Sequence, residues 1–384
     1  MLKSFSVCNY KRFESTVNID FGKVGGYQFN TDCIYEDTLA KCILYGRNAT
    51  GKTCFGLAIM DICDVLSTSN YYYIRESRIL NSNSDEKYAS FEYEFYFNQT
   101  DVKYIYSKND NNEMCKEQLF IEDKQVFEVD FENNIVVASG LSLIGAETIQ
   151  FKKYVEMISE EQKSVDEDGY LRTPFLRYIL NNAALNKKDI LVKLEDYVQR
   201  MRYSATGKSM RGYAINSKFN EYLGEEDNKQ DFENFLNMMG VDCRLKLIEN
   251  IEGRKELYFD YKRPLPFYEN ASSGTVALVN FYRRFIASNI RPSFIYMDEF
   301  DAFAHYEMAE KTVEFLKKYY PECQVVLTTH NTNLMSNEIM RPDCLFLISS
   351  EGGITPLCRA TGRELREGHN LEKLYIAGEF EQYE

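Results

Sequence analysis

Apolar and polar residues alternate along this chain with two different periods, and the period changes from region to region. In the first forty residues the apolar residues fall at every second position, as at Val17, Ile19 and Phe21. Strict alternation is the pattern of a strand with one buried face. Residues 88–129 repeat this pattern around a polar turn at residues 109–112. Both regions are therefore predicted to form antiparallel strands.

The middle of the chain has helical spacing instead. Between residues 150 and 245, apolar residues recur three and four positions apart, which predicts helices joined by polar loops. Strand character returns at residues 245–261. The predicted helical segments are 151–158, 176–185, 190–201 and 232–239.

In the last third of the chain, strands alternate with helix. Strands are predicted at residues 294–297, 325–327 and 345–348, with a helix at 308–319 that ends before Pro321. Strands that alternate with helices pair in parallel. The whole pattern predicts an α/β fold with N-terminal antiparallel strands, a mostly parallel core sheet and an inserted helical lobe.

Composition and charge restrict the class of protein. The 384 residues are 44% hydrophobic and 27% charged, which is typical of a globular chain. No apolar stretch approaches the length that crosses a membrane, and the alternating N-terminus does not resemble a secretory signal. We therefore expect a cytoplasmic protein without membrane contact. The formal net charge of −14 restricts any nucleic-acid contact to a local site, because nucleic-acid-coating domains are usually basic.

The cysteine and histidine content argues against structural metal or disulfides. Ten cysteines occur without a C-x-x-C pair, and the chain has three histidines. Several cysteines, such as Cys42, Cys54 and Cys63, lie inside apolar patterns where a small hydrophobic residue would serve. We expect reduced core cysteines, with neither a zinc site nor a disulfide framework.

One stretch identifies a ligand class. It follows the apolar run 42–45, precedes a segment of helical spacing and fits the phosphate-loop pattern G-x-x-x-x-G-K-[ST]. Backbone N–H groups of such a loop surround phosphate oxygens, the lysine reaches the β- and γ-phosphates, and the final hydroxyl ligates Mg²⁺. The predicted nucleotide-binding residues are Gly46, Arg47, Asn48, Ala49, Thr50, Gly51, Lys52 and Thr53.

Two carboxylates follow a predicted buried strand. Strand 294–297 runs directly into Asp298 and Glu299, in the manner of a Walker B motif. Asp298 is predicted to hold Mg²⁺, and Glu299 to orient and polarise the water that attacks the γ-phosphate. A pair of acids at a solvated strand end is common, so the surrounding motifs decide between the two interpretations.

Two further features flank this strand. Upstream, Ser272, Ser273 and Gly274 open an amphipathic helix, whose N-terminus is a second device suited to phosphate. Downstream, strand 325–327 leads through two threonines to His330. Taken alone, the first would be an ordinary helix cap and the second a structural histidine.

The order of these motifs resembles the ATP-binding-cassette (ABC) type of ATPase head, the group that contains SMC, Rad50, RecF and OLD proteins. The resemblance implies that residues 272–275 form the signature motif and that Asp298 is the Mg²⁺-binding acid. It also implies that Glu299 is the catalytic glutamate and that His330 is the switch histidine contacting the γ-phosphate. Lys52 completes the catalytic set.

A narrower resemblance comes from the form of the signature. Ala271, Ser273 and Thr275 replace residues of the usual L-S-G-G-Q. The Ser-Ser-Gly-Thr form, together with the run 365–378, is similar to stand-alone bacterial ATPases of the AAA15/AAA21 type in anti-phage modules such as PARIS and AbiL. No sustained heptads occur, so the long coiled-coil arm of some relatives is not expected.

The resemblance divides the chain into three parts. Residues 1–149 would form the N-terminal lobe of the ATPase with the phosphate loop, and residues 150–262 a helical lobe insertion. Residues 263–384 would form the C-terminal lobe with the signature, the Walker B strand and the switch histidine.

The resemblance also implies partners. In this family the signature helix and the phosphate loop of one head lie on distant faces, so a homodimer is expected to sandwich two ATP molecules and Mg²⁺. In an anti-phage module the ATPase would respond to a phage-derived trigger and regulate a separate effector, such as a TOPRIM-type nuclease or a toxin. No D-x-D cluster suited to a fused nuclease follows His330.

Some alternatives stay open on sequence. A RecF- or Rad50-like DNA-repair ATPase that clamps DNA directly is the rival function, and ATP and GTP are not separated. The glutamine that couples nucleotide to the helical lobe in this family is Gln118 or Gln150. Arg75 and Arg78 occupy the approximate place of a DNA-contacting arginine in SMC heads, although a surface role is favoured.

One segment combines cations with tyrosines, as local nucleic-acid contacts do. A solvated loop is the favoured interpretation, because charged surface segments are common. The residues concerned are Arg200, Arg202, Lys208 and Arg211, with Tyr197, Tyr203 and Tyr213.

Overall fold

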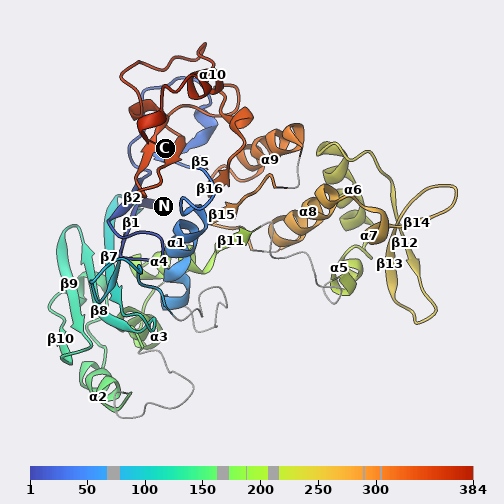
Figure 1. Ribbon diagram of the computed structural model, residues 1–384. Coiled ribbons are helices and arrows are strands. Elements are labelled where there is room, and N and C mark those ends of the chain that lie inside the picture. The colour runs from blue at the N-terminus through green and yellow to red at the C-terminus, as the bar shows by residue number, and fades with distance from the viewer. Residues whose placement is uncertain are drawn as a thin grey trace.

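Two sheets face each other across one long helix in the computed structural model of the chain (Figure 1). The structure describes residues 1–66, 78–161, 173–186, 188–205, 216–288, 290–302 and 305–383. A separate lobe extends from one side of the sheets, on the right of Figure 1. The predicted α/β class, with antiparallel strands at the N-terminus and a mostly parallel core sheet, is confirmed.

The core sheet has six strands in the order β11-β15-β16-β5-β17-β18. All neighbours pair in parallel except β17 and β18, which are antiparallel. β5, β15, β16 and β17 are buried along their whole length, as expected for strands covered on both faces. The bounds are β5 Lys41–Tyr45, β11 Met201–Ala205, β15 Phe294–Asp298, β16 Gln324–Thr329, β17 Leu345–Ile348 and β18 Ile354–Pro356.

The second sheet is antiparallel and has seven strands, in the order β10-β9-β8-β7-β6-β1-β2. Its central strands alternate buried and exposed residues, as the sequence predicted. The bounds are β1 Leu2–Cys8, β2 Val17–Asp20, β6 Ala89–Phe97, β7 Thr100–Lys108, β8 Met114–Ile121, β9 Lys124–Asp130 and β10 Ile135–Val137. A two-stranded ribbon, β3 (Ile34–Tyr35) with β4 (Thr38–Leu39), lies between β2 and β5 in the sequence.

Helix α1 (Lys52–Leu66) lies between the two sheets and is buried almost all round. Towards the antiparallel sheet, the Phe55 ring packs edge-on against Phe5, and Tyr93 donates a hydrogen bond to the Ala58 carbonyl. Towards the core sheet, Gly56 lies under the ring of Tyr296, where an added Cβ would come within 2.2 Å of the ring. The absence of a side chain at this position allows helix and strand to approach closely.

The lobe is built from helices and a small sheet. Helices α6 and α8 pack on α9 (Tyr306–Tyr319) through aromatic rings, with Phe315 contacting Phe235 and Phe281. A π-helical turn, η4 (Tyr282–Ile286), leads from α8 back to β15, and its Arg284 donates a hydrogen bond to Ser204 of β11. The bounds are α5 Asn216–Tyr222, α6 Glu226–Met238, β12 Leu245–Glu249, β13 Lys255–Phe259, β14 Leu265–Pro266, α7 Phe267–Asn270 and α8 Ser273–Phe281.

The segment from residue 150 to 205 differs from a purely helical insertion. Helices α2 (Phe151–Glu161), α3 (Phe175–Asn182) and α4 (Ile190–Gln199) are present as expected, but β11 follows α4 and joins the edge of the core sheet. The predicted helix 190–201 continued into this strand because no Gly or Pro separates the two elements. The strand β11 is short and has two buried residues, so its apolar spacing also fits one more turn of a helix.

Helix α10 (Leu371–Ile376) lies above the core sheet in Figure 1, and a short 3-10 helix, η7 (Glu381–Tyr383), follows it. Among the residues that the structure describes, no helix combines the length and the apolar character that a membrane span requires.

Candidate nucleotide-binding site

Three parallel strands end at the same edge of the core sheet, and each leads into a predicted site residue. β5 ends at Tyr45 and is followed by the phosphate loop. β16 ends at Thr329, directly before His330, and β15 ends at Asp298, directly before Glu299. β16 pairs with both of the other strands. The carboxyl edge of an α/β sheet is the usual place for a ligand site, and the structure brings these predicted residues together there.

The phosphate loop turns through conformations that favour glycine. Gly51 has φ +109°, and a Cβ there would come within 2.7 Å of the Phe13 ring. At Gly46 a Cβ would come within 2.4 Å of Ile348 on β17. The Thr50 hydroxyl donates a hydrogen bond of 2.9 Å to the carbonyl of Arg47, which closes the loop on itself. Both glycines of the motif therefore have a steric reason as well as a phosphate-binding one.

Lys52 is buried at the start of α1, with its ammonium group directed back into the loop. Its Nζ donates hydrogen bonds to the carbonyls of Gly46, at 2.6 Å, and Arg47, at 3.0 Å. Burial lowers the pKa of Lys52, and the negative charges of Asp298 and Glu299 partly offset that shift. The loop thus holds a cation beside the two carboxylates of β15.

Thr53 and Asp298 form the closest contact of the site. The Thr53 hydroxyl donates a hydrogen bond of 2.6 Å to Oδ2 of Asp298. A hydroxyl and a carboxylate oxygen side by side are hard oxygen ligands of the type that Mg²⁺ prefers. Asp298 is buried and Thr53 is exposed, so the pair lies at the boundary between the sheet and solvent. The residues present therefore fit the predicted ion.

Thr328 of β16 was not assigned a role from the sequence, yet it holds both carboxylate residues in place. Its hydroxyl donates a hydrogen bond of 2.8 Å to Oδ1 of Asp298 and accepts one of 2.8 Å from the backbone N–H of Glu299. The side chain is fully buried. Glu299 has φ +49°, a left-handed conformation that is uncommon for a residue with a side chain. Thr328 supports this turn.

Tyr203 of β11 and Tyr296 of β15 are two further residues that the sequence analysis did not place in the site. The Tyr203 hydroxyl lies 3.4 Å from Oδ2 of Asp298, the oxygen that also accepts from Thr53. Its ring stacks on Tyr296, whose hydroxyl donates to the Lys52 carbonyl at 2.6 Å. The register of β11 against β15, unknown before the structure, brings Tyr203 to this position.

The predicted signature residues lie elsewhere. Ser272 is the N-cap of α8, where its side chain accepts a hydrogen bond from the N–H of Thr275 and also bonds to the hydroxyl of that residue. Ser272 and Ser273 are exposed, and Gly274 is buried. Figure 1 shows α7 and α8 in the lobe, on the far side of β11 from α1. The predicted helix start is confirmed, but this chain does not bring it to its own phosphate loop.

The remaining predicted residues do not join the site. Gln118 lies on β8 in the antiparallel sheet, and Gln150 precedes α2, where its carbonyl accepts from Tyr178. Both positions therefore lie outside the carboxyl edge of the core sheet. Arg78 is exposed and its backbone bonds to Asp110, whereas Arg75 lies outside the described residues.

The predicted cationic segment is also largely committed to the fold. Tyr197 is buried, and its hydroxyl donates to the Gln324 side chain at 2.6 Å. Arg200 pairs with Asp196, and Arg202 donates to two backbone carbonyls. Tyr203 lies beside Asp298, as described above, and Lys208, Arg211 and Tyr213 lie outside the described residues.

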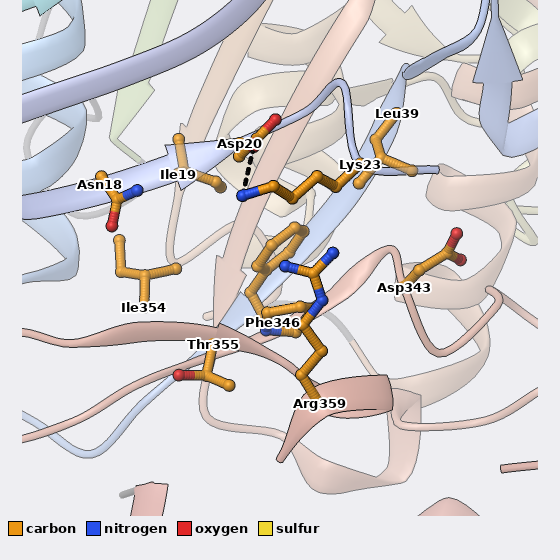
Figure 2. Close-up of a pocket in the computed structure, with 11 residues that line it drawn as sticks. Asn18, Ile19, Asp20, Lys23, Leu39, Asp343, Phe346, Ile354, Thr355 and Arg359 are labelled. Atoms are coloured by element: carbon orange, nitrogen blue, oxygen red, sulfur yellow. Dashed lines mark ion pairs between the residues drawn. The ribbon is translucent and has the colours of Figure 1, made fainter. Parts of the chain in front are cut away.

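A small cavity of about 210 Å³ lies between β2 and the β17–β18 hairpin. Figure 2 shows the Lys23–Asp20 ion pair at one wall of the cavity, with Arg359 and Phe346 also lining it. Its volume is below the range of about 300–1,000 Å³ of typical small-molecule sites. None of the predicted nucleotide-binding residues lines it.

Comparison with protein families agrees with this geometry. Residues 146–336 match the family described as "AAA domain, putative AbiEii toxin, Type IV TA system". The matched range includes the start of α8, the β15 carboxylates and His330, and it begins after the phosphate loop. Together, the match and the site support an ABC-type P-loop ATPase domain.

Heads of SMC proteins are among the solved structures similar to this chain. They include an Smc head bound to the C-winged helix domain of ScpA, with 16% identity, 93% of this chain and 97% of that chain covered, and TM-score 0.49. An SMC head from Thermotoga maritima has 14% identity, coverage of 92% and 98%, and TM-score 0.45. An Smc head from Pyrococcus yayanosii has 13% identity, coverage of 98% and 99%, and TM-score 0.48. Comparison with curated proteins found no match.

Proposed function

We propose that the chain is a Mg²⁺-dependent ATPase that pairs head to tail as a two-fold symmetric dimer around two ATP molecules. One observation carries this proposal: Lys52, Thr53 and Asp298 converge within one chain, while the exposed start of α8 lies apart from them in the lobe. Each ATP would contact the phosphate loop of one protomer and Ser272–Gly274 of the other, because a two-fold axis places the same surfaces opposite each other twice.

The residues at the sheet edge have separate tasks in hydrolysis. The loop N–H groups and Lys52 bind the β- and γ-phosphates, and Thr53 with Asp298 would hold the ion. Mg²⁺, when bound, supplies charge neutralisation of the phosphate oxygens. Glu299 orients the attacking water, and the hydrogen bond from its N–H to Thr328 fixes its backbone. His330, at the end of the neighbouring strand, would contact the γ-phosphate.

The reaction would serve a switch in anti-phage defence. The γ-phosphate would hold the two protomers together, so the dimer would persist until hydrolysis and would report nucleotide state to a separate effector, a nuclease or toxin. The matched family, whose description names a type IV toxin–antitoxin system, supports a module of two components. The residues after His330 are used by the ATPase fold, since β17 pairs with β5 and Leu371 and Phe380 are fully buried.

Two substitutions test this proposal. Lys52→Ala should abolish ATP binding, because the buried cation that faces the phosphates is lost. Glu299→Gln should retain ATP binding, reduce turnover by about 100-fold or more, and trap an ATP-bound dimer. Phosphate release measures turnover, and light scattering after size-exclusion chromatography measures the dimer.

Glu322→Gln is the matched control, because Glu322 is exposed and precedes β16 at the opposite edge of the sheet. Its turnover should equal that of the unmodified protein. Unchanged turnover in both Lys52→Ala and Glu299→Gln would remove the ATPase assignment. If the Glu299→Gln protein binds ATP but stays monomeric, the proposed ATP-bound dimer is wrong.

A further inference from the structure

The turn between β13 and β14, residues 260–264, presents an exposed aromatic side chain beside exposed cations. Tyr261 is 58% exposed, and Lys262 and Arg263, which follow it, are exposed as well. A large aromatic ring in solvent contributes little to folding. An exposed ring beside exposed charges is instead typical of a surface that binds a partner.

A fourth exposed side chain, that of Arg244, comes from the segment directly before β12. The N–H of Asp260 donates a hydrogen bond of 2.8 Å to the carbonyl of Arg244, which brings exposed Arg244 beside the turn. Lys246, two residues further along, pairs with Asp260 at 2.8 Å. The Lys246 hydrogen bond lowers the pKa of Asp260, and the charge of Arg244 adds to this effect. The one carboxylate of the turn is thus already occupied by Lys246.

The remaining cations of this surface are Arg244, Lys262 and Arg263, and all three are exposed. In the part of the lobe that the structure describes, no carboxylate forms an ion pair with Arg244, Lys262 or Arg263, and none of the three donates a side-chain hydrogen bond. The chain has a formal net charge of −14, so acidic partners for surface cations are abundant elsewhere. Three unpaired cations around one exposed tyrosine therefore form a local positive surface on an acidic protein.

A second exposed tyrosine, Tyr319, provides a comparison, because neighbouring side chains of the same chain cover its ring. Tyr319, at the end of α9, is 45% exposed. Its ring stacks on Phe315 at 4.4 Å between centroids, and Lys318 lies over it at 5.5 Å. The ring of Tyr261 is tilted against that of Phe259, with 6.1 Å between the two centroids. The Tyr261 ring keeps a face available, whereas the Tyr319 ring is covered from within the chain.

We propose that this surface, Arg244 with Tyr261, Lys262 and Arg263, binds single-stranded nucleic acid. A base would stack on the Tyr261 ring, and the three cations would contact the flanking phosphates. This combination of stacking and charge recognises single strands without requiring a particular sequence. A duplex does not fit the same surface, because its bases are already stacked and hide their faces. The surface lies on the small sheet of the lobe, at the end away from the core sheets in Figure 1.

The experiment measures fluorescence anisotropy of labelled 12-nucleotide dT and rU strands with the full chain, between 50 and 200 mM salt. Both strands should bind, and the logarithm of affinity should fall with the logarithm of salt with a slope of about −2 for three phosphate contacts. Tyr261→Ala should weaken binding by about tenfold, and Tyr261→Phe should restore it. The double change Lys262→Gln and Arg263→Gln should reduce the slope to about −0.7.

Three results would overturn the proposal. These are no single-strand binding at 50 mM salt, equal affinity of Tyr261→Ala and unmodified protein, or tighter binding of a 12-base-pair duplex. A polyglutamate peptide that binds as tightly as dT would assign the surface to an acidic protein instead. The matched control, Tyr319→Ala with Lys318→Gln, should leave affinity unchanged. ATP hydrolysis should be unaffected by Tyr261→Ala, so failure here and failure of the ATPase proposal are separate outcomes.

Discussion

The carboxyl edge of the core sheet and the start of α8 are built in opposite ways, although both are predicted to contact the same nucleotide. At the sheet edge, Asp298 accepts hydrogen bonds from Thr53 of α1 and Thr328 of β16, so three elements fix one carboxylate. In the lobe, Ser272 bonds to Thr275 of its own helix and faces solvent. The first region is assembled by the fold of one chain. The second is presented outward, as a surface that a partner would complete.

A mixture of two inactive variants tests most directly whether the two regions act together across a dimer. Lys52→Ala inactivates the phosphate loop at the sheet edge. Ser273→Arg places a bulky cation at the start of α8 and leaves the Ser272 cap in place. Each variant alone should be inactive. A one-to-one mixture should regain about a quarter of the normal phosphate release, because half of the dimers are mixed and each has one intact site of two.

The readouts of this mixture are phosphate release and bound ATP per chain, with circular dichroism to show that both variants are folded. A mixture that stays inactive and binds no ATP would place both halves of the site in the same chain. The outward-facing start of α8 would then need another explanation.

Thr328→Val tests the assembled side with a nearly isosteric change. The hydroxyl that supports Asp298 and the Glu299 backbone is lost, and two buried groups lose their partner at a cost of roughly 1–3 kcal/mol. We expect turnover to fall by about ten- to a hundredfold. In a metal titration, a higher Mg²⁺ concentration should be needed for half-maximal activity. Thr312→Val is the matched control, since Thr312 is also buried and bonds to a carbonyl of its own helix α9. Equal turnover in both variants would contradict the role of Thr328.

Tyr203→Phe is expected to have a smaller effect on the same carboxylate. The hydroxyl is 3.4 Å from Asp298, at the long end of a hydrogen bond, so its removal should cost about 1 kcal/mol or less. Turnover should fall by about two- to fivefold, with the change seen in the Mg²⁺ concentration for half-maximal activity. Tyr320→Phe removes a better-formed bond, at 2.9 Å to Phe285, outside the site. If Tyr320→Phe lowers turnover as much as Tyr203→Phe, the loss of turnover reflects lower stability of the fold and not a role of Tyr203 in the site.

The last prediction concerns stability and should leave the sheet edge untouched. Glu117 of β8 is buried and accepts hydrogen bonds from the first N–H groups of α3, at Phe175 and Leu176, and from the Tyr104 hydroxyl. Burial raises the pKa of Glu117 to about 7, although these hydrogen bonds oppose the shift. The folded state therefore binds the proton more tightly than the unfolded state, and this group's contribution is present below its ordinary pKa and lost as pH rises to about 7.

The free energy of unfolding should accordingly fall by about 3 kcal/mol between pH 4.5 and 7 from this group alone. Glu117→Gln should remove that part of the slope, as measured by chemical denaturation at several pH values, while ATP hydrolysis per folded chain stays the same. A slope identical in the variant would show that Glu117 does not titrate in this range.

The sequence predicted the parts of the site that occupy consecutive positions. The phosphate loop, Asp298 with Glu299 and the start of α8 are each local patterns, and the structure has them on the expected elements. Tyr203 and Thr328 were missed because their role depends on strand register. Only the pairing of β11 and β16 with β15 brings these side chains to Asp298. The Thr-Thr pair at the end of a buried strand was the one available signal.

The fold shows the same division. Long alternating strands and amphipathic helices were predicted. The strand β11 was not predicted, and its first residue lay in the expected helix 190–201. The small lobe sheet was predicted as strand character without its pairing. Short elements carry few residues, so their pattern fits either period. Their pairing is decided by contacts with residues far away in the sequence.

The fit of Gly56 under Tyr296 has a consequence for how this molecule can move. An added Cβ at Gly56 would come within 2.2 Å of the Tyr296 ring, and Phe5 and Tyr93 contact α1 on its other side, so close packing fixes the start of α1 relative to β15 and Asp298. Close-packed interiors transmit displacement as rigid bodies. We therefore expect a rearrangement on nucleotide turnover to displace the lobe, with the two sheets and α1 moving as one rigid unit.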